Sequence, residues 1–227
     1  MVIAKARGIP LAYDPIGDLA PIAQVGLSTT LFLVNAESKF SSFQDFISHA
    51  KANPGKLNFG SNGYGGSYHL ALEQIKALAG VDIAHVPFRG GAPSMLELLA
   101  GRVDAIFAST SLGLPQLSGG KVKLLALGSG QRSDLYPGVP TIAEAGYPGF
   151  DVSLGLGLFA PRDTPGPLIT KINTDVNRLL VDVDLLSKLK EEGITATPGT
   201  PAQFQARLAA DLEATVQLVR RLNIKNE

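Results

Sequence analysis

Short apolar runs alternate with amphipathic segments through the middle of the chain. The runs have the length and β-branched or aromatic content of buried strands, and the segments between them place apolar residues at helical spacing. Alternation of strands and helices favours an α/β fold with a parallel sheet covered by helices on both faces. The predicted strands are residues 31–34, 56–60, 83–88, 104–108 and 123–128.

Helix start signals support this reading. Ser41 with Gln44 three residues later has the pattern of a capping box, and the apolar residues after it fall on one helical face. Further helices are expected over residues 66–79 and 93–100, and residues 137–148 read as a proline- and glycine-rich loop with one helical turn at 141–145.

The second half of the chain predicts a return to another domain. Residues 152–160 form an extended apolar stretch that we interpret as a hinge strand, and residues 22–34 are the other candidate crossing. Two helices follow, one capped by Thr164 and Pro165 and the last capped by Thr200 with Gln203, with a short strand at 194–197 between them. Two crossings predict a discontinuous first lobe (1–26 and 155–227) and a continuous second lobe (27–154), the layout of a hinged two-lobe binding protein.

Charge and composition limit the partners. The 227 residues include 20 basic and 20 acidic side chains, so the formal net charge is zero and no overall field attracts nucleic acid or an anionic membrane. Any anion must therefore be recognised locally. Cysteine is absent, which excludes disulfides, and no apolar run approaches the length of a membrane span or of a signal-peptide core.

A glycine- and serine-rich turn between a strand and a helix is the most informative segment. Glycines let backbone N–H groups face outward, and the helix N-terminus adds partial positive charge, so such a turn suits a carboxylate. The alternative is a tight turn with no ligand; a nucleotide is disfavoured because the glycine spacing is wrong and the P-loop lysine is missing. The candidate ligand-binding residues in this turn are Ser61, Asn62, Gly63, Tyr64, Gly65, Ser67 and His69.

A second turn follows the next strand and contains Arg89, Gly90 and Gly91. The Arg89 guanidinium can face a carboxylate, and Ser109 follows a further strand. Because parallel strands end at the same edge of a sheet, we expect these residues to line one polar cleft with Ser61.

The residue inventory does not favour an enzyme. His49, His69 and His85 lack metal-binding spacing, and Ser61 and Ser67 lack a nucleophile elbow. We therefore predict no catalytic residue, no metal and no cofactor.

Five segments of the chain carry a family resemblance: residues 13–19, 53–61, 85–91, 101–104 and 139–146. Through them the chain resembles the substrate-binding receptors of tripartite tricarboxylate transporters, the Bug receptors, over essentially its whole length. The resemblance implies a periplasmic-binding-protein-like (Venus flytrap) α/β fold, and a periplasmic receptor that captures a small organic carboxylate for membrane transporter subunits. It also implies that the turns of Ser61–His69 and Arg89–Gly91 face the ligand.

The chain also departs from the family pattern. Gly155 stands where tryptophan is usual. Family members begin with strand and helix units that build the first lobe, and this chain enters the family pattern after those units. A truncated first lobe leaves apolar helix stripes uncovered. We therefore expect this form to dimerise through that lobe, to exchange elements or to bind ligand poorly.

Two other functions remain open at this point. One is a bilobal ligand-sensing regulatory domain, which an upstream DNA-binding helix-turn-helix would distinguish; none is visible in this chain. The other is an α/β enzyme acting on a carboxylate. A dicarboxylate, an aromatic acid and an amino acid are all compatible with a cleft of amides and hydroxyls.

Overall fold

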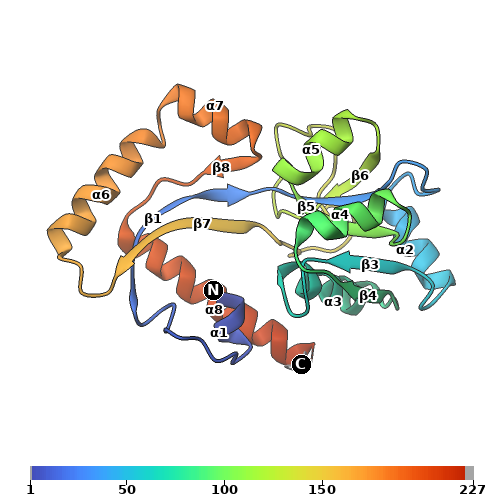
Figure 1. Ribbon diagram of the computed structural model, residues 1–227, viewed down its shortest axis with the longest axis horizontal. Coiled ribbons are helices and arrows are strands. Elements are labelled where there is room, and N and C mark those ends of the chain that lie inside the picture. The colour runs from blue at the N-terminus through green and yellow to red at the C-terminus, as the bar shows by residue number, and fades with distance from the viewer. Residues whose placement is uncertain (1, 223–227) are drawn as a thin grey trace. The chain divides into compact units, whose positions relative to one another are not determined.

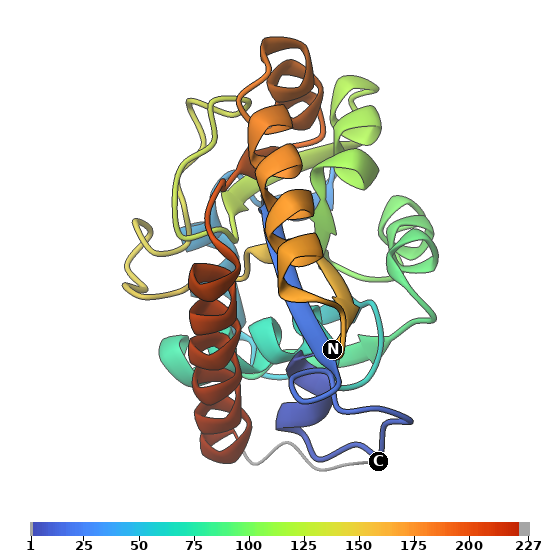
Figure 2. The ribbon, with the colours of Figure 1, turned by 90° about the vertical axis from the view of Figure 1, so that its left-hand side faces the viewer.

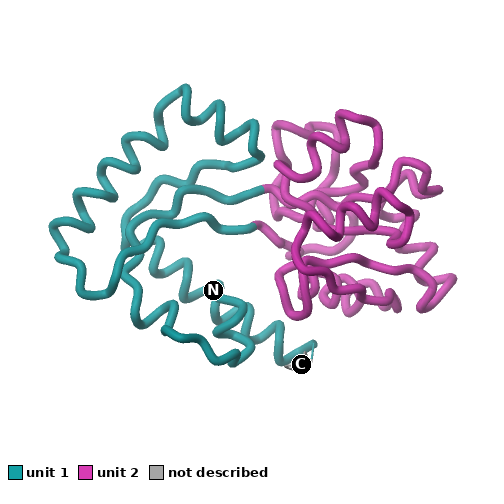
Figure 3. The backbone as a smooth tube through the Cα atoms, in the orientation of Figure 1, with its two compact units in different colours: residues 1–28, 154–226 teal, residues 29–153, 227 magenta. Residues whose placement is uncertain are grey.

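The chain divides into two compact units, which we describe separately (Figure 3). A computed structural model describes residues 2–222. Within that range, unit 1 consists of residues 2–28 and 154–222, and unit 2 is the continuous segment 29–153. Unit 1 is thus built from two distant parts of the chain.

Unit 2 is a five-stranded sheet with helices on both faces (Figure 1). The strand order is β4-β3-β5-β2-β6, in which β3 is parallel to β4 and β5 while β2 is antiparallel to β5 and β6. The strands are β2 (Thr30–Asn35), β3 (Asn58–Ser61), β4 (Ala84–Pro87), β5 (Ala105–Ser109) and β6 (Val122–Leu127). The helices are α2 (Phe43–Ala52), α3 (Ser67–Ala79), α4 (Gly91–Leu99) and α5 (Thr110–Ser118).

Alternation along the central strands separates two cores. Leu31 and Leu33 face one side of the sheet and pack with Met95 and Leu98 of α4. Phe32 faces the other side, where its ring meets Phe43 of α2 edge to face at a centroid distance of 5.0 Å. Because β2 is buried on both faces, its sequence is continuously apolar rather than alternating.

Unit 1 is a three-stranded antiparallel sheet between helices. Its order is β7-β1-β8, formed by β1 (Leu19–Ser28), β7 (Leu154–Pro161) and β8 (Ile194–Ala196). Ala160 packs in the apolar cluster of α6, whereas the next residue along, Phe159, packs on Phe204 of α8. Consecutive strand residues face opposite sides, so α6 and α8 cover opposite faces of the sheet (Figure 2). The helices are α1 (Val2–Ala6), α6 (Gly166–Leu179), α7 (Val183–Glu191) and α8 (Pro201–Arg221).

The direction of β2 corrects the expectation of a fully parallel sheet. β2 follows β1 after the single residue Thr29, and it is paired with β5 and β6, which lie some seventy or more residues later. The handedness rule for crossovers constrains only strands joined by a helix and adjacent in the sheet. Since β5 lies between β2 and β3, nothing in the local sequence requires β2 to be parallel.

Two predicted helix caps are also wrong. The N-cap of α2 is Ser42, whose hydroxyl accepts from the Asp45 N–H, and Ser41 donates to the Asp45 carboxylate instead of pairing with Gln44. Thr164 does not cap α6, because its hydroxyl donates to the Pro161 carbonyl. The capping box of Thr200 and Gln203 at α8 is confirmed.

Three helices were not expected from the sequence. α1 is five residues long, and α5 contains Gly113 and Pro115, which resemble a loop in sequence. α7 is nine residues long and begins at Asp182, whose carboxylate accepts from the Leu185 N–H. Short helices of this kind form because tertiary packing supports them rather than because of propensity.

Candidate functional site

Three strand ends and three helix starts meet at one edge of the unit 2 sheet (Figure 1). β4, β3 and β5 are neighbours and run in the same direction, so their carboxyl ends share an edge. α3 begins six residues after the last residue of β3, α4 begins four residues after β4, and α5 follows β5 directly. The N-termini of three helices therefore lie at this edge.

None of these three helices has a side-chain cap. The N-cap residues are Gly66 for α3, Gly90 for α4 and Ser109 for α5, and no N-cap side chain accepts a hydrogen bond from the helix. By contrast, Ser42 caps α2 in the same unit. The first N–H groups of a helix have no partner inside the helix, so uncapped starts leave them available to an anion.

The turn between β3 and α3 depends on glycine. Gly63 has φ 134° and Gly65 has φ 65°, values that side chains other than glycine rarely adopt. The Ser61 hydroxyl lies 3.1 Å from both the N and the O of Gly63, and the Gly65 N–H donates to His69 Nδ1 at 2.8 Å. The turn is thus held from inside by two side chains, Ser61 and His69.

Behind this turn, His69 and His85 stack face to face. Their ring centroids are 3.8 Å apart and the planes differ by 5°. The Tyr64 ring lies against the pair, with its centroid 4.8 Å from that of His69 and 5.9 Å from that of His85. His85 Nε2 lies 2.6 Å from Ser61 Oγ.

The surroundings of the stacked pair favour the neutral form of its histidines. Burial lowers the pKa of His85 to about 4, and the charges of His69 and Lys76 act in the same direction. Because His69 Nδ1 accepts from the Gly65 N–H, the neutral His69 carries its proton on Nε2, which lies 3.9 Å from the Glu73 carboxylate. The site therefore presents backbone dipoles rather than histidine cations at neutral pH.

The second turn joins β4 to α4. Its Arg89 is exposed, and no ion pair of Arg89 is found within residues 2–222. Gly90 has φ 113°, and Gly91 approaches α5 closely, since a Cβ there would lie 3.1 Å from the Leu112 side chain. Ser109, at the end of β5, lies 3.1 Å from the Ser111 hydroxyl. This turn brings an exposed guanidinium and two glycines to the same edge as α3.

The structure sorts the predicted residues into three groups by their exposure. Ser61 and His69 are buried, so their side chains support the turn from behind. Tyr64 and Arg89 are exposed. The partly exposed residues at the edge are Asn62, Gly63, Ser67, Gly90, Gly91 and Ser109; Gly65 is buried.

His85 is the site residue that sequence reasoning missed. It was considered only as a metal ligand, yet it contacts both Ser61 and His69. A signal was present, because His85 lies two residues before the end of the strand paired with β3, and parallel neighbours bring such positions together. The register pairs Phe59 with His85, so the His85 ring needs only to extend along β3 to reach Ser61 at its end.

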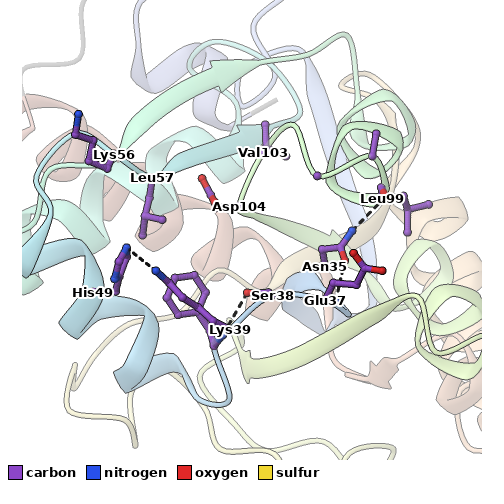
Figure 4. A pocket seen from close by; sticks show the side chains of 13 residues that line it. Asn35, Glu37, Ser38, Lys39, His49, Lys56, Leu57, Leu99, Val103 and Asp104 are labelled. Atoms are coloured by element: carbon purple, nitrogen blue, oxygen red, sulfur yellow. Dashed lines mark hydrogen bonds between the residues drawn. The ribbon is translucent and has the colours of Figure 1, made fainter.

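A separate pocket lies at the other end of the unit 2 sheet (Figure 4). It has a volume of about 600 Å³ and includes Asn35, at the end of β2, and Leu57 and Asp104, which precede β3 and β5. Several of its polar groups are already paired: Asn35 donates to the Leu98 and Leu99 carbonyls, and Asp104 accepts from the Asn58 N–H. None of the predicted ligand-binding residues lines it.

The described residues contain no group of three or more His, Cys, Asp or Glu side chains that would hold a metal ion. Among the helices of residues 2–222, none combines the length and apolar character needed to cross a membrane.

Comparison with protein families finds a match over residues 7–224 to the family described as "Tripartite tricarboxylate transporter family receptor". A curated relative from Pseudomonas sp. (strain P51), the "UPF0065 protein in tcbD-tcbE intergenic region", is 34% identical over 208 residues. That alignment covers 91% of this chain and 62% of the relative, so the chain spans less than two thirds of the relative's length.

Two solved structures share the fold closely. "R. palustris Rpa4515 with adipate" has a TM-score of 0.88 at 30% identity, with 96% of this chain and 73% of that chain covered. "MatC (Rpa3494) from Rhodopseudomonas palustris with bound malate" has a TM-score of 0.82 at 30% identity, with 96% and 75% covered. These likenesses confirm the predicted α/β fold of the periplasmic-binding-protein type.

Proposed function

Because the chain belongs to the family of tripartite tricarboxylate transporter receptors, we propose that it is a periplasmic solute-binding protein that captures a small organic carboxylate for such a transporter. The observation that carries this proposal is the set of three helix N-termini without side-chain caps at one edge of the unit 2 sheet. Membership alone names a class of protein. The uncapped helices support placing the carboxylate at this edge of the sheet.

Backbone groups supply the main attraction in this proposal. Each helix N-terminus carries about half a positive charge, and its first N–H groups point along the axis toward the ligand. α3 offers the N–H groups that begin at Ser67, and α4 offers those that begin at Gly91. Arg89 adds a guanidinium that pairs with a carboxylate in a bidentate manner. Since the formal net charge of the chain is zero, recognition depends on these local groups.

The ligand class follows from the relatives and from the chemistry of the edge. The two similar structures are described with adipate and with malate, both of which are dicarboxylates. A dicarboxylate is therefore our first candidate, ahead of an aromatic acid or an amino acid. A group of neutral dipoles with one arginine favours anions over cations, because a cation would meet positive helix ends.

We propose that the chain binds its ligand without transforming it and delivers it to membrane transporter subunits. Ser61, the one serine that contacts a histidine ring in the described turn, donates or accepts within the turn and is fully buried. A nucleophile needs an exposed oxygen beside a free base. Buried in this way, Ser61 holds the turn in place.

We also propose that a second copy of the chain pairs with the outer edge of β7. β7 ends the three-stranded sheet of unit 1, so within the described residues one of its edges lacks a partner strand. Leu156 and Leu158 on this strand are 40% and 42% exposed. An apolar, unpaired strand edge pairs readily with an identical edge across a two-fold axis.

The binding proposal is tested by a charge placed in the anion position. Ser67→Asp adds a carboxylate to the first turn of α3, where it occupies the N–H groups and repels a ligand. We expect calorimetric titration of the wild-type chain with adipate and L-malate to show binding of at least one, and Ser67→Asp to lose at least tenfold in affinity. Stability should stay the same or rise by about 0.3–1 kcal/mol, since an acid at a helix N-terminus is favourable.

Ala202→Asp is the matched control, because it adds the same charge to the first turn of α8, which Thr200 already caps. This variant should bind like the wild type. Equal affinity of Ser67→Asp and wild type would show that α3 does not hold the carboxylate. A wild-type chain that binds no dicarboxylate, aromatic acid or amino acid would refute the receptor function itself.

A further inference from the structure

The stacked histidines are built into the turn that the carboxylate proposal relies on, yet that proposal gives them no part. His69 is 5% exposed and contacts the turn through one nitrogen, while His85 reaches it from the neighbouring strand. Each ring holds a different point of the turn, one at Gly65 and the other at Ser61.

The contact of His69 depends on a lone pair. The Gly65 N–H donates to His69 Nδ1 at 2.8 Å in a buried environment, so this nitrogen must be unprotonated. A doubly protonated imidazole has donors at both nitrogens and no acceptor. Protonation of His69 would therefore replace the hydrogen bond with two opposed N–H groups, and the Gly65 amide would have to turn away.

The contact of His85 reaches the turn through Ser61. Ser61 Oγ lies 2.6 Å from His85 Nε2 and 3.1 Å from both the N and the O of Gly63. A neutral His85 either donates to or accepts from this hydroxyl, depending on its tautomer. A charged His85 would force the hydroxyl to accept from the ring and would place a cation against the neighbouring imidazole.

The groups that face the pair disfavour a proton on it. The rings are 3.8 Å apart, so two imidazolium charges would repel strongly, and the charge of Lys76 acts on His85 in the same sense. Glu73 lies 3.9 Å from His69 Nε2, but its carboxylate also accepts from Lys76 Nζ at 2.9 Å. The Tyr64 ring lies against the pair and reduces its contact with water.

We propose that His69 and His85 are positioning residues for the carboxylate site: as a neutral stacked pair they hold the Ser61–Gly65 turn, and the site loses affinity when the pair takes up a proton. This inference rests on the proposed carboxylate-binding function. It makes ligand release sensitive to acid through the turn and not through direct contact between ligand and histidine.

The direction of the pH effect follows from the geometry. A pair that contacted the ligand directly would bind an anion more tightly when protonated, because a cation would face a carboxylate. A pair that positions the turn does the opposite, since protonation breaks the Gly65 contact. Since the pKa of His85 is lowered to about 4, the loss of affinity begins below about pH 5 and grows as the pH falls through 4.

Variants of similar shape that do not titrate distinguish direct contact with the ligand from positioning of the turn. In His69→Asn the side-chain oxygen takes the place of Nδ1 as acceptor, and in His85→Gln the amide takes the place of Nε2 beside Ser61; neither side chain titrates. We would measure adipate affinity from pH 7.5 to 3.5 for the wild type and for the double variant. Dividing the two affinities at each pH removes the titration of adipate itself. We expect the affinity of the wild type to fall at least about threefold more than that of the double variant between pH 7.5 and pH 3.5, each compared with its own value at pH 7.5.

A ligand-free measurement accompanies the titration. Hydrogen exchange of the Gly65 amide, followed by NMR together with the imidazole nitrogens, should lose protection as the pair protonates in the wild type and not in the double variant. Parallel pH profiles of wild type and double variant, or a wild type that binds more tightly in acid, would overturn the proposal. If no form binds adipate or L-malate at pH 7.5, the proposed function fails, and a Gly65 amide with unchanged protection would then refute the positioning role independently.

Discussion

Gly157 shows how one missing side chain decides local packing. A Cβ at this position would lie 2.2 Å from Cζ and 2.8 Å from Cε1 of Phe204. Phe204 is 6% exposed and also packs on Phe159 at a centroid distance of 5.1 Å, so the ring has little room to move. Gly157 thus lets the first turn of α8 seat against β7.

We expect Gly157→Ala to lower the free energy of unfolding by about 1–3 kcal/mol, because the added methyl group overlaps a buried ring. Urea denaturation followed by circular dichroism measures the change. Gly155→Ala is the control on the same strand: its Cβ would approach Gln24 Nε2 only to 3.7 Å, and we expect a change within about 0.5 kcal/mol. Equal effects of the two substitutions would contradict the close approach of Phe204.

The family resemblance drew attention to Gly155, the less constrained glycine of this pair. Gly155 was singled out because tryptophan is usual there, and its Cβ direction is open. The constraint lies at Gly157, whose partner is nearly fifty residues away in sequence. A contact between residues so far apart in sequence leaves no local sequence pattern around either of them.

At the scale of elements, the helices begin in two ways. α2, α7 and α8 start at a side chain that accepts a hydrogen bond from the helix, namely Ser42, Asp182 and Thr200. α3, α4 and α5 start at Gly66, Gly90 and Ser109 without such a bond. α6 in unit 1 also lacks one, because its N-cap is Pro165, whose side chain has no acceptor. Capping stabilises a helix start, so its omission at three neighbouring helices favours a function over stability.

Thr200 carries a measurable part of the stability of α8. Its hydroxyl accepts from the Gln203 N–H while the Gln203 side chain accepts from the Thr200 N–H at 2.8 Å. Thr200→Ala should therefore cost about 1 kcal/mol. Thr164→Ala is the matched control, since the Thr164 hydroxyl donates to the Pro161 carbonyl and does not cap α6, and its effect should stay within about 0.5 kcal/mol. Thermal unfolding of both variants gives the comparison, and a larger loss for Thr164→Ala would contradict the assigned caps.

Sequence patterns predicted elements well where the signal was local. The strands of unit 2 and the capping box of α8 follow from runs and spacings of a few residues. The start of α2 was misplaced by one residue because Ser41 and Ser42 are adjacent and both suit an N-cap. Only the backbone shows which serine has extended dihedral angles, and Ser42 does, with φ −146° and ψ 163°.

At the scale of the whole molecule, unit 2 is a compact unit formed by one continuous segment of the chain. Its first strand and its last residues are joined inside the unit: Thr30 Oγ1 donates to the Val152 carbonyl at 2.9 Å, and the Gly128 N–H donates to the Thr30 carbonyl at 2.7 Å. The apolar clusters on both faces of its sheet use residues of this segment alone. Unit 1, in contrast, takes its central strand β1 from a distant part of the chain.

We expect residues 29–153, expressed alone, to unfold cooperatively in urea and to keep the near-ultraviolet circular dichroism of packed aromatic rings. Residues 154–227 alone should show neither property, because β7 and β8 pair only through β1. A non-cooperative transition for the isolated 29–153 segment would show that its fold depends on unit 1.

Association through β7 is a further prediction at this scale. Light scattering coupled to size exclusion should give the mass of a dimer for the wild type and of a monomer for Leu158→Lys, because a charge on an exposed strand edge opposes pairing. Leu96→Lys changes an equally apolar residue that is 64% exposed on α4 of unit 2, and it should remain dimeric. A monomeric wild type at micromolar concentration would exclude the association.

The sequence by itself determined which segments are strands, where most helices lie, and that glycine-rich turns follow β3 and β4, because these features depend on neighbours within a few residues. Tertiary structure alone decided that β2 runs against β5 and β6, that His69 stacks on His85, and that three uncapped helices start at one edge. Each of these depends on which strands become neighbours in the sheet. That choice is made by burial of the whole apolar surface, and a local pattern does not record it.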